Sequence, residues 1–405
     1  MKVLQINKFY YLKGGSERHI FALSKLLADS GHQVVQFSMA DDKNYYSKFS
    51  QYFSKPVNLD KFSLKNIFKL FYNREAAKKL ENLIRAERPD LAHLHNISHQ
   101  LSSSVIKVLK KYNIPLVQTL HDYKLICPNY KLFSHGRVCY KCRGGKYYNC
   151  FLNKCLKNSY LISFLAMFEA YYCRWQKVYE KINLFIAPSR FMKDICVKFG
   201  VPENKIKLIY NFINPETGAV ENLAEKSQPD YFLYFGRLSE EKGIRVLLEA
   251  MKKLNGIKLK IAGAGPDYKK YQSLAAEYKL NDRVEFLGPK YGDELRRLIK
   301  QAKAVIMPSL WPENLPYTAL ESLSLNKIVI ASNIGGLPEI IQDGFNGLLF
   351  KSGDSLDLAG KISLILNDER MAKSIETNAK SSLNKFNSQE HYRAISRVYQ
   401  NLVKF

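Results

Sequence analysis

The sequence lacks any run of about 18 uncharged apolar residues, the length that a membrane-spanning helix requires. It also lacks an Asp-x-Asp pair with which a site could hold a divalent metal. The first residues lead directly into an apolar strand pattern without the features of a cleavable signal. We therefore expect a cytoplasmic protein, bound at most peripherally to the inner face of a membrane.

Acidic residues are scarce: 37 Asp and Glu stand against 62 Lys and Arg, a formal net charge of +25. Residues 1–213 hold 35 basic and 14 acidic residues, whereas residues 214–405 hold 27 and 23. Lys outnumbers Arg about three to one, and Arg is the residue that nucleic-acid readers use for base edges. We expect an anionic membrane surface or an acidic sugar as partner of the first half, and no nucleic acid. A lysine-rich proteome is the alternative explanation.

The length of 405 residues and the hydrophobic content of 46% predict a large core divided among two or three domains. Short apolar strand patterns alternate with amphipathic helix patterns along both halves, which is typical of parallel sheets with both faces covered. The predicted parts are a first domain (1–213) with a Cys-rich insertion (124–158), a polar linker (214–230), a second domain (231–387) and a last helix (388–405).

The stretch Pro308–Glu321 follows a buried strand pattern and leads through a polar loop into a helix that starts near Pro316. A helix N-terminus at the end of a strand attracts phosphate, and the carboxylates of Glu313 and Glu321 accept hydrogen bonds from hydroxyl groups. A ligand with phosphate and sugar hydroxyls would suit both. Solvated loop and helix charges are the alternative.

Three other strand ends carry candidate binding residues. The loop Gly236–Gly243 brings Arg237 and Lys242 to one place, as a departing nucleotide diphosphate requires, although a solvated loop would also contain them. A Gly14-Gly15 pair before a helix lets backbone approach a ligand, or forms an ordinary turn. His121 ends the strand predicted at 115–120, where it contacts a ligand or caps the next turn.

Five cysteines cluster between residues 127 and 155. In a reducing compartment such a cluster indicates metal rather than disulfides, and a Cys-x2-Cys pair is a natural chelate for zinc. Cys139, Cys142, Cys150 and Cys155 form the most compact set for one structural zinc, with Cys127 as spare or substitute. Free thiols that line a loop are the alternative.

Two stretches with aromatic residues allow two interpretations each. Over 61–79 the apolar residues share one helical face flanked by Lys61, Lys65 and Lys69, as in a helix at an anionic membrane interface or in one packed on the core. Residues 159–181 carry many aromatics at helical spacing. We expect these to be buried, rather than to form an apolar groove for a lipid tail.

The order of several motifs resembles that of a known family. Glu313-x7-Glu321, then Gly-Gly-Leu-Pro-Glu at 335–339 and Asp-Gly-Phe-Asn-Gly at 343–347, is similar to the retaining family-4 glycosyltransferases (glycosyl transferases group 1) of the GT-B fold. The resemblance covers nearly the whole chain. One residue departs from the pattern: Asn314 stands where the family usually has Gly, and we expect Asn to tolerate the same loop geometry because it accepts positive φ.

The resemblance implies two Rossmann-like domains facing across a cleft, with the last helix crossing back to the first domain. It implies that a UDP- or GDP-linked sugar is held mainly by the second domain and a glycan acceptor by the first. The implied catalytic residues are Glu313, Arg237, Lys242 and His121. The implied donor-binding residues are Gly14, Gly15, Gly236, Arg237, Lys242, Asn314, Leu315, Pro316 and Glu321.

We therefore expect a retaining glycosyltransferase that needs no catalytic metal and extends a lipid-linked glycan of a surface polysaccharide, such as capsule or lipopolysaccharide. A nucleotide-sugar epimerase of the same fold is one alternative, which release of free nucleotide without an acceptor product would favour. A zinc-ribbon nucleic-acid binder is another, against which the lysine bias and the ordered motifs of the second half argue.

Overall fold

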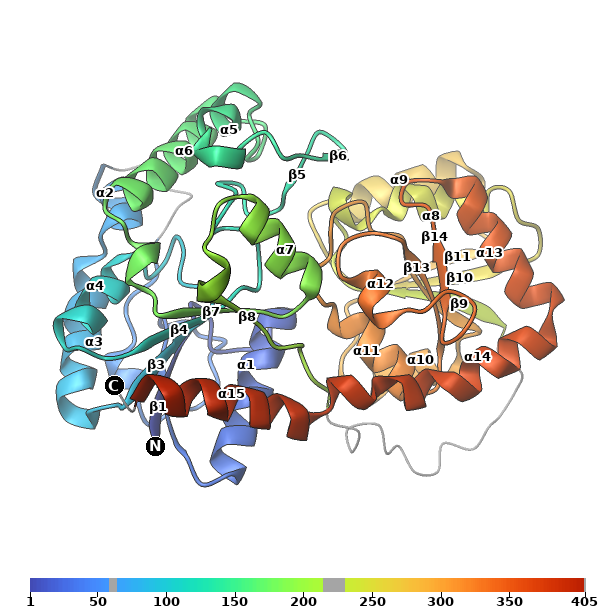
Figure 1. Ribbon diagram of the computed structural model, residues 1–405. Helices are drawn as coiled ribbons and strands as arrows, with labels where there is room; N and C mark the ends of the chain where they lie inside the picture. Colours follow the sequence, from blue (N-terminus) through green and yellow to red (C-terminus); the bar gives the residue numbers. More distant parts are fainter. Residues whose placement is uncertain (58–63, 214–229, 404–405) are drawn as a thin grey trace. The chain divides into compact units, whose positions relative to one another are not determined.

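The computed structural model describes residues 1–57, 64–213 and 230–403, which form two compact units (Figure 1). The first unit comprises residues 1–131, 140–210 and 389–405, and the second comprises 132–139 and 211–388. Residues 214–229 of the predicted linker lie outside the described residues, as do residues 61–63 of the amphipathic stretch 61–79.

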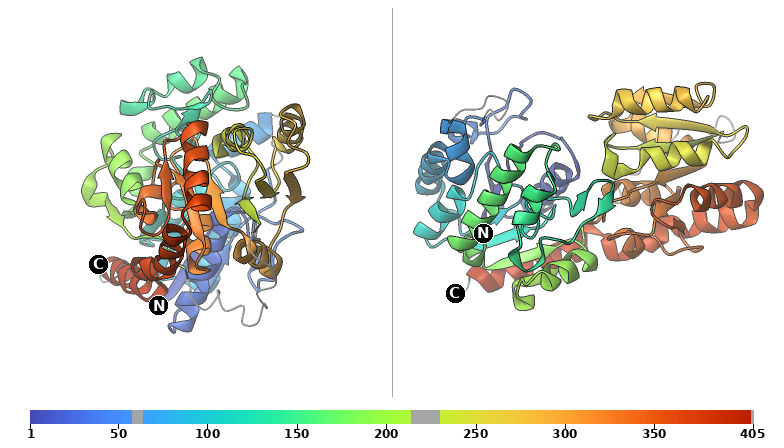
Figure 2. Two further views of the ribbon diagram at one scale, coloured as in Figure 1. Left: turned by 90° about the vertical axis from the view of Figure 1, so that its right-hand side faces the viewer. Right: turned by 90° about the horizontal axis from the view of Figure 1, so that it is seen from above.

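The first unit is built on a six-stranded parallel sheet. Its strands are β1 (Lys2–Ile6), β2 (Gln33–Phe37), β3 (Leu91–Leu94), β4 (Leu116–Thr119), β7 (Leu184–Ala187) and β8 (Ile206–Leu208). The spatial order is β2-β1-β3-β4-β7-β8, and Val3 pairs with Val34 on one side and Leu91 on the other. The central strands are fully buried because helices lie on both faces of the sheet (Figures 1 and 2).

The helices of the first unit are α1 (Gly15–Asp29), α2 (Leu64–Phe71), α3 (Arg74–Glu87), α4 (Ser104–Lys111), α5 (Tyr148–Leu152), α6 (Tyr160–Trp175), α7 (Arg190–Lys198) and α15 (Ser388–Val403). Several begin at a side chain that caps the free N–H groups of the first turn. The Asn73 side chain, for example, accepts from Ala76 N at the start of α3, and Ser159 accepts from Ile162 N at the start of α6.

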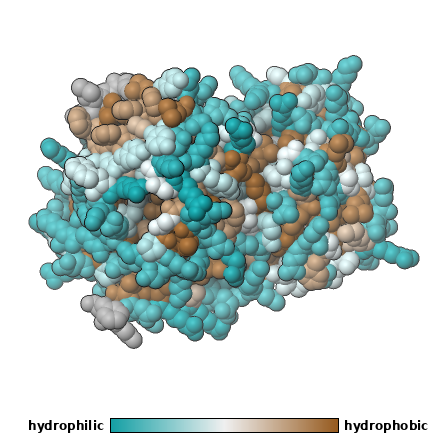
Figure 3. Space-filling view, turned by 45° about the horizontal axis from the view of Figure 1, so that its top comes forward, coloured by the Kyte–Doolittle hydropathy of each residue, from teal (hydrophilic) through white to brown (hydrophobic). Residues whose placement is uncertain are grey.

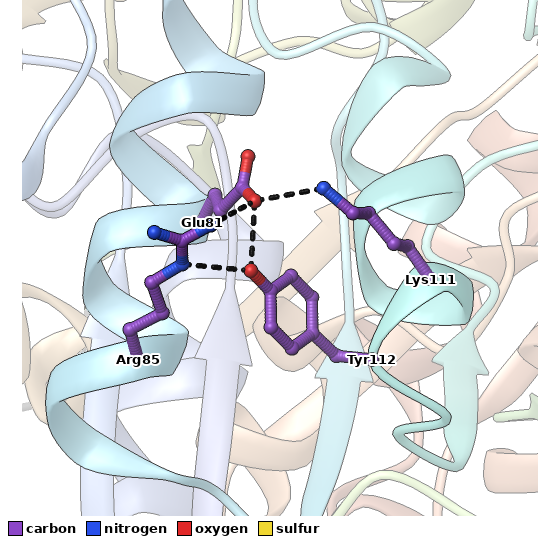
Figure 4. A network of polar contacts seen from close by, with 4 residues as sticks. All are labelled: Glu81, Arg85, Lys111 and Tyr112. Atoms are coloured by element: carbon purple, nitrogen blue, oxygen red, sulfur yellow. Dashed lines mark hydrogen bonds and ion pairs between the residues drawn. The ribbon is translucent and has the colours of Figure 1, made fainter.

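A polar network joins α3 to α4 at the surface (Figure 4). Glu81 Oε1 accepts from Arg85, Lys111 and Tyr112 at 3.0, 2.9 and 2.7 Å. The hydrogen bonds from Lys111 and Tyr112 lower the pKa of Glu81 to about 2. The carboxylate therefore stays charged, and holds the two helices together at the surface, throughout the physiological pH range.

The second unit repeats the parallel architecture with a different strand order. Its strands are β9 (Tyr231–Phe235), β10 (Lys258–Ala262), β11 (Val284–Gly288), β12 (Ala304–Met307), β13 (Ile328–Ser332) and β14 (Leu348–Phe350). The order β11-β10-β9-β12-β13-β14 reverses direction between β9 and β12. In open α/β sheets ligands bind outside the carboxyl ends of the strands at such a reversal.

The helices of the second unit are α8 (Ile244–Met251), α9 (Tyr268–Glu277), α10 (Gly292–Gln301), α11 (Tyr317–Ser324), α12 (Leu337–Ile340), α13 (Ser355–Asn367) and α14 (Glu369–Ser381). The short antiparallel pair β5 (Phe133–Ser134) and β6 (Arg137–Val138) also belongs to this unit. Across both units, no helix within the described ranges is long and apolar enough to cross a membrane.

The last helix, α15, returns the chain to the first unit. Tyr399 on this helix is fully buried, and its hydroxyl lies 2.6 Å from Nδ1 of His93 in β3. His391, about two turns earlier on the same helix, donates from Nδ1 to the carbonyl of Tyr210 at 2.8 Å. These buried hydrogen bonds fix the end of the chain against the sheet of the first unit.

Candidate active site

Two loops meet where the strand order of the second unit reverses. Gly236–Gly243 follows β9, and Pro308–Pro316 follows β12. Gly243 has φ +71°, and a Cβ there would lie 1.8 Å from the carbonyl oxygen of Pro308. Leu310 N also donates to the Glu241 carbonyl at 2.9 Å. Only glycine permits this approach, so the loops are held together backbone against backbone.

A half-buried ion pair lies between the two loops. Lys242 Nζ is 2.7 Å from Glu313 Oε1, and Ser309 Oγ donates to the same oxygen at 2.7 Å. The Glu313 side chain is 5% exposed and the Lys242 side chain is 24% exposed. Glu313 is therefore buried, whereas Lys242 remains partly accessible to solvent. The ring of Trp311 lies 5.3 Å from Lys242 Nζ and shields it on one side. Two residues 71 positions apart are thus brought into one charged site.

The Gly-Gly pair of the motif at 335–339 fixes the backbone of Glu313. Gly336 N donates to the Glu313 carbonyl at 2.7 Å. Gly335 has φ +62°, and a Cβ there would lie 2.4 Å from that carbonyl oxygen. The two motifs that the resemblance rests on are therefore in direct contact, and the second sets the position of the first.

Other predicted residues of this unit follow Glu313 along the chain. Pro316 stands immediately before α11, and Glu321 is half-buried about one turn inside that helix. Asn211 donates from Nδ2 to the Leu315 carbonyl at 3.0 Å, which holds the loop just before the helix. Asn314 has no positive φ, so the tolerance of Asn for that conformation is not what preserves the loop.

Arg237 and Gly236 occupy the exposed part of the loop after β9. Gly236 has φ +144°, a backbone conformation that residues with side chains rarely adopt. Its carbonyl oxygen lies so close to Gly263 that a Cβ at position 263 would be 1.9 Å away, so only glycine fits there. The Tyr234 hydroxyl donates to the Arg237 carbonyl at 2.7 Å, which fixes the backbone while the guanidinium stays exposed. Arg237 thus offers an exposed cation on the loop that also carries Lys242.

In the first unit, His121 follows β4 and is linked to Gln5 through His95. His95 Nε2 lies 2.6 Å from Gln5 Oε1, an acceptor, so this nitrogen carries the proton that it donates. His95 Nδ1 then accepts from His121 Nε2, 2.9 Å away. Neutral imidazole has one N–H, so His121 keeps its proton on Nε2 and presents Nδ1 as an acceptor.

His121 belongs to a group of five imidazoles, four of them buried and His121 half-buried, most of which sequence reasoning missed. His93 and His95 stack at 4.4 Å between ring centroids, and His95 stacks on His121 at 5.1 Å. His19 lies 5.2 Å from His121 and 5.4 Å from His391. The available signal was the His-x-His pattern at the end of β3, because residues two apart in an extended segment face the same side.

Burial holds these imidazoles neutral. It lowers the pKa of His121 to about 3 and that of His391 to about 4. It also lowers the pKa of His19, His93 and His95 well below the usual value, and each positive neighbour would lower it further. The cluster therefore supplies hydrogen-bond donors and acceptors rather than charge.

Gly14 and Gly15 lie exposed at the start of α1. Gly14 is extended, with φ −170°, so the pair is not required by a left-handed conformation. Just inside the helix, Glu17 is buried and its Oε1 accepts from Asn7 Nδ2 at 3.1 Å. Neither Asn7, directly after β1, nor Glu17, in the first turn of α1, was predicted.

The predicted cysteine set is divided between the units. Cys142, Cys150 and Cys155 pack together in the first unit, whereas Cys139 belongs to the second. A hydrogen bond with Cys155, burial, and the nearby Cys127 and Cys142 raise the pKa of the Cys150 thiol far above its usual range. In the described part of the chain, no three His, Cys, Asp or Glu side chains form a group that could hold a metal ion. The structural zinc remains a prediction for metal analysis.

Comparison with known protein families agrees with the geometry of both units. Residues 13–217 match the model of Glycosyltransferase Family 4, and residues 218–382 match that of Glycosyl transferases group 1. The chain belongs to glycosyltransferase family 4. It is therefore a glycosyltransferase, and the family predicted from Glu313-x7-Glu321 and its flanking motifs is confirmed.

Individual relatives extend over most of the chain. An uncharacterized glycosyltransferase of Methanocaldococcus jannaschii is 26% identical over 404 residues, covering 99% of each chain. An amylovoran biosynthesis glycosyltransferase of Erwinia amylovora is 25% identical over 238 residues, covering 56% of this chain and 58% of the relative. The structure of Anabaena HepE in complex with UDP and glucose superposes with a TM-score of 0.71 at 20% identity, covering 99% of this chain and all of HepE. The GT-B fold is thereby confirmed.

Proposed function

We propose that this glycosyltransferase moves a sugar from a nucleotide-sugar to a hydroxyl of a glycan acceptor, with retention of configuration at the anomeric carbon. The observation that carries the proposal is the half-buried Lys242–Glu313 pair, 2.7 Å apart at the strand-order reversal of the second unit. Its position at the carboxyl ends of β9 and β12 is where an α/β sheet of this order binds a ligand. The UDP and glucose named for the HepE structure support a nucleotide-sugar donor.

The donor diphosphate is assigned to the cations of the loop after β9 and to the start of α11. Lys242 is partly exposed, and Arg237 is exposed on the same loop, so both side chains can reach a phosphate that enters from solvent. The N-terminus of α11 adds partial positive charge after Pro316. These groups stabilise negative charge as it develops on the diphosphate, and the reaction then needs no catalytic metal.

The sugar and the nucleoside are assigned to the two carboxylates. Glu313 and the backbone of Asn314, Leu315 and Pro316 would hold the sugar hydroxyls, and Gly236 would let the phosphates approach closely. Glu321 would accept from the two ribose hydroxyls. When the donor binds, Lys242 exchanges part of its contact with Glu313 for the diphosphate, which leaves Glu313 oxygens available to the sugar.

In the proposed step, the acceptor oxygen forms a bond to the anomeric carbon on the side from which the diphosphate leaves. The bond between the anomeric carbon and the phosphate oxygen breaks, and its electron pair goes to that oxygen. The proton of the acceptor hydroxyl moves to the same phosphate oxygen, so no additional base is required. Configuration is retained because departure and attack occur on one face.

His121, Gly14 and Gly15 are assigned to the same reaction from the first unit. Because the hydrogen bond to His95 keeps the His121 proton on Nε2, the neutral His121 would accept a hydrogen bond from a sugar hydroxyl at Nδ1. Its low pKa, about 3, keeps this acceptor lone pair available at neutral pH. The exposed backbone N–H groups at Gly14 and Gly15 would approach the diphosphate or the acceptor.

We propose a lipid-linked glycan of a surface polysaccharide as acceptor, at the inner face of a membrane. The relative that acts in amylovoran biosynthesis supports a polysaccharide product. The excess of 35 basic over 14 acidic residues in 1–213 supports attraction to an anionic surface.

Product analysis tests the proposal. The protein is incubated with UDP- and GDP-linked sugars and membrane lipid extract in the presence of a chelator, and the anomeric configuration of the product is read by NMR. We expect nucleoside diphosphate and a glycosylated lipid in equal amounts with the donor's configuration. Inverted product would contradict retention, loss of activity with chelator would contradict metal independence, and free nucleotide without glycosylated product would favour an epimerase.

A further inference from the structure

Helix α6 turns its aromatic residues outward and its small or polar residues inward. Buried on this helix are Ser163, Ala166, Glu169 and Cys173. Exposed are Tyr160 (54%), Leu161 (52%), Phe164 (43%), Phe168 (52%) and Trp175 (78%). This arrangement reverses the usual pattern of a helix on the surface of a globular protein, and it overturns the expectation that the aromatics of 159–181 are buried. The arrangement leaves a large apolar area in contact with solvent.

Two neighbouring helices extend the same surface. Phe68 on α2 is 70% exposed and Leu152 on α5 is 61% exposed. Ring contacts connect them to α6: Phe71 lies 5.4 Å from Phe168, and Phe151 lies 5.9 Å from Phe164. The aromatic face is defined as Phe68, Leu152, Tyr160, Leu161, Phe164, Phe168 and Trp175. In Figure 3, brown side chains gather at the upper left, the part of the view that holds α2 and α6.

Basic residues border the aromatic face, and acidic residues are missing from it. Residues 140–168 contain five Lys and Arg and no Asp or Glu. Lys154 Nζ lies 4.2 Å from the ring of Tyr160 near one end of α6, and Lys107 Nζ lies 3.3 Å from the Tyr172 hydroxyl near the other. The carboxylate of α6, Glu169, points inward and pairs with Lys124 at 2.7 Å.

We propose that the aromatic face inserts into the interface of an anionic lipid bilayer, with the lysines at its border contacting the headgroups. The inference rests on the proposed function and assigns its membrane partner to one surface. Tyr and Trp prefer the bilayer interface because they are partly apolar and partly polar, and lysines add attraction to anionic lipid. The apolar area and the bordering positive charge are both complementary to such an interface.

A second copy of the chain is a poorer occupant on electrostatic grounds. In a twofold dimer the same surface meets itself, so the border with Lys107, Lys154 and the other basic residues of 140–168 would face an identical positive border. Like charges at an interface oppose association, whereas anionic lipid neutralises them. Dimerisation through this face is therefore retained as an outcome that the experiment can detect.

Vesicle co-sedimentation of the full chain tests the proposal, with vesicles of neutral phosphatidylcholine alone or with a third of phosphatidylglycerol. The test variant is Leu161→Ser with Trp175→Ser, and the matched control is Tyr46→Ser with Leu356→Ser, which removes two residues elsewhere that are at least as exposed. We expect the test variant to bind anionic vesicles at least roughly tenfold more weakly, because each such side chain contributes about tenfold to partition. The control should bind as the unchanged protein does.

A second pair of variants tests the charge. Lys154→Glu with Lys157→Glu should weaken binding to anionic vesicles at least roughly tenfold at low salt, because each lysine near the surface contributes about fivefold to binding. The weakening should be smaller at high salt, which screens these charges. Lys269→Glu with Lys270→Glu, a matched exposed pair in the second unit, should have little effect. Binding that ignores lipid charge would overturn the proposal.

The two tryptophans report which surface enters the lipid. The sequence contains Trp175 and Trp311 only, so Trp311→Phe leaves Trp175 as the single emitter, and Trp175→Phe leaves Trp311. On anionic vesicles with brominated acyl chains, we expect the emission of Trp175 to shift to the blue and be quenched, and that of Trp311 to stay unchanged. Quenching of Trp311 alone, or of neither, would overturn the assignment.

Two further measurements separate this inference from the proposed function. Sedimentation without lipid should show a monomer, and a dimer abolished by Leu161→Ser with Trp175→Ser would overturn the bilayer proposal. Nucleotide-sugar binding, measured in the same variant, should be unchanged. If the protein binds vesicles but no nucleotide-sugar, the assignment of the aromatic face to the bilayer stands, and only the proposed function is contradicted.

Discussion

At the carboxyl ends of its parallel strands the second unit places charged side chains between closely packed backbones, whereas the first unit places five neutral imidazoles. Lys242 and Glu313 lie on loops held together by Gly243 and Gly335. His93, His95 and His121 stack in line, with His19 and His391 beside them. Two sheets of similar design thus provide charge in one case and uncharged hydrogen bonding in the other.

This difference fits a division of labour in the transfer reaction. A diphosphate needs cations that are fixed before it binds, and backbone packing holds the loops that carry them. A sugar hydroxyl needs neutral donors and acceptors, and a charged imidazole buried without a partner would be costly. Changes that affect one unit at a time therefore separate the contributions of the two units.

The largest expected effect is the loss of folding stability of the first unit in acid. The folded-state pKa values of the five imidazoles lie below the unfolded value near 6.5, with His121 at about 3 and His391 at about 4. Folding therefore favours the neutral forms, so the stability is complete above pH 6.5 and is lost as the pH falls below it. Each neutral histidine costs about 1.4 kcal/mol for each pH unit below 6.5, which sums to roughly 5 to 7 kcal/mol by pH 5.5.

Pulse proteolysis in urea at pH 7.5 and pH 5.5, with fragments identified by mass spectrometry, gives a midpoint for each unit. The second unit contains a single histidine, His135, and serves as the internal control. We expect the midpoint of the first unit to fall steeply and that of the second to change little. Equal changes in the two units would contradict the account of the imidazole cluster.

The next effect concerns the packing of the two loops that form the proposed donor site. Gly243→Ala forces a Cβ against the Pro308 carbonyl at 1.8 Å and retains a φ of +71°. Gly256→Ala retains a φ of +68° but meets no atom within 4 Å, so it measures the cost of the conformation alone. Both should lose about 1 to 2 kcal/mol for positive φ, and Gly243→Ala about 2 kcal/mol more for the collision. Equal urea midpoints, with equal nucleotide-sugar binding, would show that the loops do not need this contact.

The smallest effect concerns the return of the last helix to the first unit. Tyr399→Phe removes a buried hydroxyl 2.6 Å from His93 Nδ1, and should cost about 1 to 3 kcal/mol because the imidazole loses its partner. Tyr392→Phe removes a hydroxyl 3.0 Å from His32 Nε2, at a half-buried site on the same helix, and should cost less. Thermal unfolding of both variants compares them. A larger loss for Tyr392→Phe would be inconsistent with the tight packing of Tyr399.

Most helices and strands followed from local patterns, because caps and periodicity are properties of neighbouring residues. The helix predicted to start near Pro316 is α11 (Tyr317–Ser324), and the last helix, predicted over 388–405, is α15 (Ser388–Val403). The donor residues were named through a resemblance, since Lys242 and Glu313 are 71 positions apart and no local pattern connects them. Their direct contact was not predicted, because each had been assigned to a different part of the donor.

Two features could not be obtained from the sequence for physical reasons. Helical spacing shows that the aromatics of α6 share a side, but not whether that side faces the core or solvent. The imidazole cluster draws on α1, β3, the end of β4 and α15, and only the folded sheet brings His19 and His391 to His121. Both depend on how distant segments pack.

Calorimetric titration with UDP-glucose and GDP-mannose tests the central claim, that the reversal between β9 and β12 holds the nucleotide-sugar. Lys242→Ala and Glu321→Ala are compared with the unchanged protein and with Lys253→Ala, which alters an exposed lysine of the same unit. We predict that at least one of the two sugars binds the unchanged protein and the control equally. Both site variants should weaken that binding at least roughly tenfold, since a charged hydrogen bond contributes about 1.5 to 3 kcal/mol. Unchanged binding in both site variants would contradict the claim.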